Sequence, residues 1–111
     1  MKMLPTGVRI YVLGQPADLR RSFDGLAGMT RDLIKEDPLS GHLFVFANRD
    51  ADRVKILFFD RTGFVLWYKR LESAAFHFPT SAAGGVEVDA AKLVLLLDGI
   101  NLGGARATRK E

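Results

Sequence analysis

The stretch HLFVFANRDADRVKILFFDRTGFVLWYKRL, residues 42–71, decides the fold of this chain. It contains three runs rich in Val, Ile, Phe, Trp and Tyr, residue types that strands favour; the runs are 42–47, 53–60 and 64–71. Short connections at 48–52 and 61–63 separate the runs, and connections of this length join neighbouring antiparallel strands. The stretch therefore predicts three strands of an antiparallel meander.

Alternate residues of a strand share one face of the sheet. Each of the second and third runs has one wholly apolar stretch and one face that turns basic toward an end. The basic residues are Arg53, Lys55, Lys69 and Arg70. Because tryptophan is usually mostly buried, we expect Trp67 to lie in the core.

The chain before this stretch predicts one strand and one helix. Residues 8–13 alternate and carry β-branched and aromatic side chains, which is typical of a short strand. Apolar residues then recur at helical spacing from 19 to 36, after Asp18 or Ser22 as the N-cap. Pro38 ends this helix, because the residue before a proline is disfavoured in the α region.

The chain after this stretch is less regular. We expect a brief strand at 76–78 and a loop of small residues at 80–85. Asp89 is placed to cap a second helix over 90–98, which Gly99 ends.

Together these elements predict an α+β fold, an antiparallel β-meander of four to five strands with two packed α-helices. A length of 111 residues is typical of one domain, and we assign residues 1–104 to it. The basic tail 105–111 follows, and we expect it to be disordered.

Composition excludes several classes of protein. With 48% hydrophobic and 26% charged residues, the chain has the composition of a globular protein. It contains no cysteine, which excludes disulfides, thiolate metal clusters and a cysteine nucleophile. We expect no secretory leader and no membrane partner, because no apolar run approaches the ~20 residues that cross a bilayer. The expected location is cytoplasmic.

Motifs for enzymatic chemistry are absent. The two histidines, His42 and His77, lack the spacing of metal ligands, and no phosphate-binding glycine loop or serine elbow occurs. We therefore predict a protein that is not an enzyme and has no cofactor and no metal. One enzymatic alternative stays open, a small metal-dependent nuclease that uses Asp18, Asp24 or Asp60.

Positive charge is more informative than these motifs. The net charge is +3, and basic residues alternate with aromatic ones on the predicted meander, as at 53–55 and 67–70. Such a surface can hold phosphates and stack bases. The residues that we expect to contact nucleic acid are Arg20, Arg21, Arg49, Arg53, Lys55, Arg61, Tyr68, Lys69 and Arg70.

The sequence also resembles a known family. Residues 18–26, DLRRSFDGL, are similar to the D-M-R-K-[SG]-F-D-G-L signature of the TnpB-type accessory protein of insertion-sequence-66 family transposons. This protein is distinct from the RNA-guided nuclease also called TnpB. Further matches follow in order along the chain, at 40–46, 52–57, 60–64, 66–72, 78–79 and 97–100.

The resemblance implies a non-catalytic accessory protein for DNA transposition in bacteria. Its expected partners are DNA, at the transposon ends, the cognate transposase, or both, and it is a possible homo-oligomer. An alternative stays open in which the chain is a protein-interaction module of the transposition complex that does not bind DNA.

Overall fold

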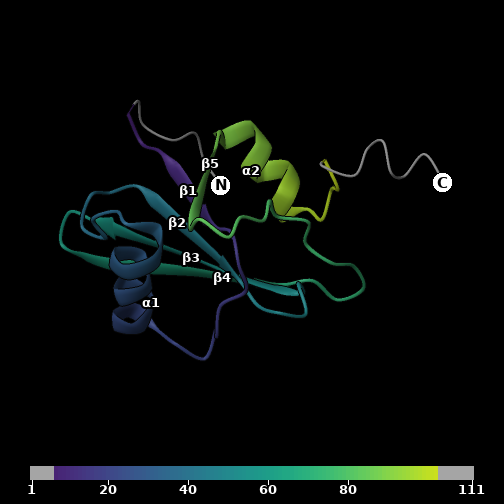
Figure 1. Ribbon diagram of the computed structural model, residues 1–111, viewed down its shortest axis with the longest axis horizontal. Helices are drawn as coiled ribbons and strands as arrows, with labels where there is room; N and C mark the ends of the chain where they lie inside the picture. Colours follow the sequence, from purple (N-terminus) through teal and green to yellow (C-terminus); the bar gives the residue numbers. More distant parts are fainter. Residues whose placement is uncertain (1–6, 103–111) are drawn as a thin grey trace.

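The structure, a computed structural model, describes residues 7–102 and consists of one five-stranded sheet with a helix on each face (Figure 1). The strand order is β4-β3-β2-β1-β5. The strands are β1 (Ile10–Leu13), β2 (Leu43–Ala47), β3 (Arg53–Asp60), β4 (Gly63–Arg70) and β5 (Gly85–Val88). The predicted α+β class is confirmed. The tail expected at 105–111 lies outside the described residues.

The meander predicted for residues 42–71 is confirmed. Strands β2 and β3 are antiparallel, with Val45 opposite Ile56, and β3 and β4 are antiparallel, with Ile56 opposite Trp67. The turn between β3 and β4 holds Arg61 at a φ of 45°. Such a left-handed residue matches the twist of the two strands it joins.

The rest of the sheet differs from a purely antiparallel meander. Strand β1 runs parallel to β2, with Ile10 opposite Leu43 and Val12 opposite Val45. A helical segment connects these two strands, and a crossover of that kind returns the chain to the end of the sheet where the first strand began. The sheet is therefore mixed.

Strand β5 lies where the sequence predicted no strand. It pairs antiparallel with β1, with Val86 opposite Val12, and it forms the edge next to β1. The strand predicted at 76–78 is wrong. The amide of Phe76 donates to the carbonyl of Ala51, and its ring is buried against the sheet, so this segment packs without joining a ladder.

The predicted first helix is shorter than 19–36. It comprises α1 (Phe23–Met29) and a π-helical continuation, η1 (Thr30–Ile34). Ser22 occupies the N-cap position, but its side chain makes no capping hydrogen bond. The amide of Lys35 donates to the carbonyl of Thr30, and Lys35 ends the segment at a φ of 69°.

Two apolar layers lie on opposite faces of the sheet, because alternate strand residues point to opposite sides. The α1 face packs beneath α1 and η1 and includes Leu26, Ile34, Phe44, Phe46 and Leu57. The α2 face packs beneath α2 (Ala90–Leu97) and includes Val45, Val54, Ile56, Leu93 and Leu97.

The second helix is confirmed. The Asp89 carboxylate accepts a hydrogen bond of 2.7 Å from the amide of Lys92, so Asp89 caps α2 as predicted. The expectation that Trp67 lies in the core is wrong, since it is 36% exposed. The apolar cluster under α2 draws its strand residues from β1, β2, β3 and β5, so Trp67 on β4 lies outside the part of the sheet that α2 covers. Within residues 7–102, no helix is long and apolar enough to span a bilayer.

Candidate nucleic-acid interface

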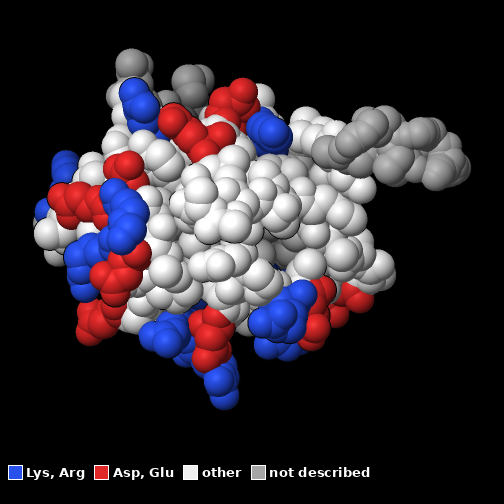
Figure 2. Space-filling view, in the orientation of Figure 1, with Lys and Arg blue, Asp and Glu red and all other residues white. Residues whose placement is uncertain are grey.

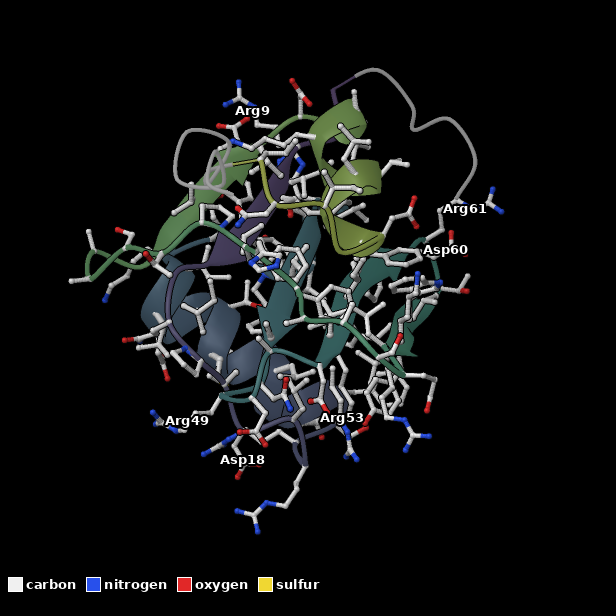
Figure 3. The ribbon with its side chains drawn as sticks, turned by 90° about the vertical axis from the view of Figure 1, so that its right-hand side faces the viewer. Arg9, Asp18, Arg49, Arg53, Asp60 and Arg61 are labelled. Atoms are coloured by element: carbon white, nitrogen blue, oxygen red, sulfur yellow. The ribbon has the colours of Figure 1, made fainter. Side chains whose placement is uncertain are left out.

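A basic groove of about 500 Å³ lies at one end of the sheet. It forms where the segment before α1, the β2–β3 loop and the adjoining ends of β3 and β4 meet. Figure 3 shows three of its residues, Asp18, Arg49 and Arg53, gathered at this end. The groove is lined by Ala17, Asp18, Leu19, Arg20, Asn48, Arg49, Asp50, Arg53, Lys55 and Tyr68.

The β2–β3 loop owes its shape to one amide side chain. The Asn48 oxygen accepts hydrogen bonds from the amides of Asp52, at 3.1 Å, and Arg53, at 2.9 Å. The Asn48 nitrogen donates to the carboxylate of Asp52 at 2.7 Å. Because the loop backbone is held in this way, Arg49 is exposed on a fixed turn.

Lys55 forms the floor of the groove. Its ammonium donates to the carbonyls of Leu19, at 2.6 Å, and Arg21, at 2.9 Å. The same ammonium lies 5.0 Å from the centre of the Tyr68 ring, within the range of a cation–π interaction. Lys55 is 9% exposed, so it holds the segment before α1 in place and has little surface left for a ligand.

Asp18 and Arg20 form an ion pair at the rim of the groove. Arg20 donates to both carboxylate oxygens, at 2.9 Å from Nε and 2.8 Å from Nη2, and its amide donates to Asp18 at 3.0 Å. These hydrogen bonds lower the pKa of Asp18 to about 2 and raise that of Arg20. The charge of Arg20 is therefore partly neutralised by its neighbour.

Three exposed arginines at this end of the molecule differ from Arg20 in their pairing. Among residues 7–102, the side chains of Arg21, Arg49 and Arg53 form no ion pair. Arg70 lies directly opposite Arg53 on the neighbouring strand and is paired with Glu72 at 3.0 Å. Two like charges facing each other across a ladder repel unless an anion lies between or beside them.

Two of the residues expected to contact nucleic acid lie elsewhere. Lys69 is on the α2 face, where its ammonium donates to the carbonyl of Leu97 at 3.0 Å and lies 3.7 Å from Asp98. Arg61 is in the turn at the opposite end of β3 and β4 and is paired with Asp60 (Figure 3). Of the nine predicted residues, Arg20, Arg49, Arg53, Lys55 and Tyr68 line the groove, and Arg21 and Arg70 are close to it.

The residues considered for metal chemistry are dispersed. Asp18 and Asp60 lie far apart in Figure 3, Asp18 at the bottom of the view and Asp60 at its right-hand side. The ring of His42 accepts a hydrogen bond of 2.9 Å from the amide of Arg9 through Nδ1. No group of three metal-binding side chains occurs among the described residues.

Sequence reasoning did not assign Asn48 or Asp18 to the nucleic-acid interface. Asn48 organises the loop, and Asp18 both lines the groove and pairs with Arg20. An asparagine at the start of a short connection between strands is a signal for such a turn, because its side chain can bond the backbone that follows. The pairing of Asp18 with Arg20 depends on the backbone geometry of the segment before α1.

Comparisons with known proteins find similar sequences over most of the chain. A family model described as IS66 Orf2 like protein matches residues 8–107. Two proteins of Sinorhizobium fredii are similar. The uncharacterized protein y4hO is 36% identical over 101 residues, or 89% of this chain and 88% of its own length. The uncharacterized protein y4jC is 35% identical over 95 residues, which cover 86% of this chain and 81% of the length of y4jC. No solved structure gives a significant match.

Proposed function

The chain belongs to the IS66 Orf2-like family, and from this premise we propose that it is a non-catalytic accessory protein of transposition that binds DNA through the basic groove. The expected target is duplex DNA at the ends of the transposable element. The proposal concerns binding alone and assigns no chemical step to this chain.

The exposed arginines at one end of the sheet carry this proposal. Arg21, Arg49 and Arg53 are exposed, and the residues that line the groove, with Arg49 and Arg53 among them, include two more cations than carboxylates. Guanidinium groups form directed hydrogen bonds with phosphate oxygens. An arginine that has no ion pair in the free protein can bind a phosphate without first breaking another interaction. Tyr68 is 52% exposed and offers a ring against which a sugar or an unpaired base could lie.

The salt dependence of DNA binding tests the proposal. We expect fluorescence anisotropy with a labelled transposon-end duplex to show binding that weakens as salt increases. If three arginines contact phosphates, log affinity should fall against log salt with a slope of about −3. Absence of binding at low salt would contradict the proposal, and a slope near zero would contradict phosphate contact.

Matched arginine substitutions locate the contact. Arg49→Ala should weaken binding and reduce the slope by about 1, because one phosphate contact is lost. Arg61→Ala is the control, since Arg61 is exposed in a turn at the far end of the same strands. Equal losses for the two variants would indicate a general charge effect and would contradict binding at the groove.

A second candidate function is docking on the cognate transposase without DNA. It is favoured by the uncharged area on the face seen in Figure 2, over which α2 passes. Val94 and Leu95 of α2 are 47% and 43% exposed, and exposed apolar side chains of this kind are common where proteins meet. Co-purification with the transposase that survives high salt and nuclease treatment would support this candidate over DNA binding.

A further inference from the structure

The two edges of the sheet differ in length and chemistry. β5 has four residues, and β4 has eight. A long unprotected edge strand is a ready template for another strand, and proteins usually interrupt such edges with proline, a bulge or charged side chains. β4 contains no proline, and its charges occur at one end, in Lys69 and Arg70.

Exposed apolar side chains accompany this edge. Val65 and Trp67 are 38% and 36% exposed on the α2 face, beyond the strands that α2 covers. On the α1 face, Phe64 and Leu66 are partly buried and Tyr68 is exposed. Five consecutive residues of an edge strand are therefore apolar or aromatic.

The hydrogen bonds of β4 show which backbone groups are free to pair. The amide of Leu71 donates to the carbonyl of Asp52, which continues the ladder with β3. Backbone groups of successive residues in a strand point alternately to either side. The backbone amides and carbonyls of the odd-numbered residues of β4 therefore point toward β3. Those of the even-numbered residues, Phe64, Leu66, Tyr68 and Arg70, point outward.

The sequence of β4 is complementary to itself when a second copy is placed antiparallel to it. With Leu66 opposite Leu66 of the second copy, Phe64 lies opposite Tyr68 and Val65 lies opposite Trp67. Every one of these cross-strand pairs is apolar or aromatic, the kind that stabilises a sheet. In this arrangement the outward-facing backbone groups of Phe64, Leu66 and Tyr68 on both chains form the hydrogen bonds between the two strands.

The same register separates the positive charges. Lys69 lies opposite Gly63 of the second copy, and Arg70 lies opposite Thr62. The turn that meets this basic end carries the ion pair of Asp60 with Arg61 and has no net charge. A parallel arrangement would instead place the two basic ends together.

We propose that the chain forms a symmetric dimer in which the β4 strands of two copies pair antiparallel about Leu66, extending the two sheets into one. The pairing follows from the edge itself and is independent of DNA binding. Because the two-fold axis is perpendicular to the extended sheet, the two basic grooves lie on the same side of it.

Analytical ultracentrifugation of the DNA-free protein over a range of concentrations tests the dimer. The wild-type chain should show its mass double as the concentration rises. Val65→Lys should remain monomeric, because it places a charge at the centre of the pairing. Val94→Lys is the matched control, since Val94 is also an exposed valine but lies on α2, and it should dimerise as the wild type does.

Two outcomes would overturn the dimer. One is a wild-type chain that stays monomeric throughout the range, and this result does not depend on how any variant folds. The other is equal dimerisation of Val65→Lys and the wild type, with circular dichroism showing that the variant is folded. Trp67 is the single tryptophan of the chain, so its emission should shift to shorter wavelength as dimer forms.

Cysteine cross-linking tests the register, against the background of a chain that has no cysteine. Residues 65 and 67 of opposite copies form a pair without backbone hydrogen bonds between them, the closer type of antiparallel pair. Mild oxidation of a mixture of Val65→Cys and Trp67→Cys should give a disulfide between the two variants. Cross-linking of Trp67→Cys with itself, in place of the mixed product, would contradict pairing about Leu66.

Discussion

The two faces of the sheet are each joined to a neighbouring segment by one lysine, and the two lysines differ in burial. On the α1 face, Lys55 is 9% exposed and binds two carbonyls of the segment before α1. On the α2 face, the side chain of Lys69 is 35% exposed and binds the last carbonyl of α2 together with Asp98. In the sequence both residues are lysines on neighbouring strands of one basic cluster.

This difference shows that formal charge and available charge are separate quantities. Each lysine was predicted to contact phosphates, and in the structure each donates to carbonyl groups of its own chain. The arginines beside the groove, whose side chains lie in solvent, are the more accessible cations. A count of basic residues therefore overstates the number of phosphate contacts that this surface can make.

The largest effect is expected for Lys55→Met, which keeps the length of the side chain and removes its charge. Two carbonyls lose a charged donor in a partly buried setting, so we expect the free energy of unfolding to fall by about 2–3 kcal/mol. Denaturant titration followed by circular dichroism measures this. Lys92→Met is the control, because Lys92 is exposed on α2, and its variant should unfold as the wild type does. Equal stability of the two variants would contradict the conclusion that Lys55 holds the segment before α1 in place.

A smaller effect is expected for Lys69→Met. The ammonium at the C-terminal end of α2 interacts with the helix dipole and with Asp98, but it is partly exposed to solvent. We therefore expect a loss of less than about 1 kcal/mol in the same titration. The loss should decrease in high salt, whereas that of Lys55→Met should change little. A loss larger than that of Lys55→Met would reverse the comparison between the two faces.

The smallest effect on stability is expected from Asp18, whose ion pair with Arg20 lies at the surface. The pKa of Asp18 is lowered in the folded chain to about 2, from an ordinary value of 3.8. The contribution of this carboxylate to stability is therefore complete above pH 4 and is lost as the pH falls through about 2. A carbon NMR titration of the Asp18 carboxyl group should report this pKa, and Arg20→Gln should raise it toward the ordinary value. An unchanged pKa in the variant would contradict the assigned cause.

Much of the fold could be predicted from local patterns. The strands over 42–71 and the cap of α2 at Asp89 depend on alternation, turn length and a local hydrogen bond, all of which are present in short segments. The parallel pairing of β1 with β2 also had a signal, because a helix between two strands is the usual connection of a parallel pair. No sequence signal of comparable strength predicted the short β5, because this strand forms by pairing with the free edge of β1.

The groove could be predicted in composition but not in arrangement. Five of the nine expected residues line it. Arg53, Lys55 and Tyr68 do so because the basic ends of β3 and β4 lie beside each other in an antiparallel hairpin, whereas Arg20 and Arg49 are brought there by the segment before α1 and the β2–β3 loop. The exclusion of Arg61 follows from the same hairpin, which places its turn at the far end. The engagement of Lys55 depends on the approach of a segment more than thirty residues earlier in the chain.

The sequence by itself determined the family, the meander and the two helices, because these depend on residue types at short spacing. The tertiary structure decided which cations remain exposed, which aromatic side chains lie outside the core and which strand forms the long edge. These properties depend on contacts between segments distant in the chain. A lysine binds phosphate or its own backbone according to what packs above it, and Trp67 is exposed because its strand lies outside the part of the sheet that α2 covers.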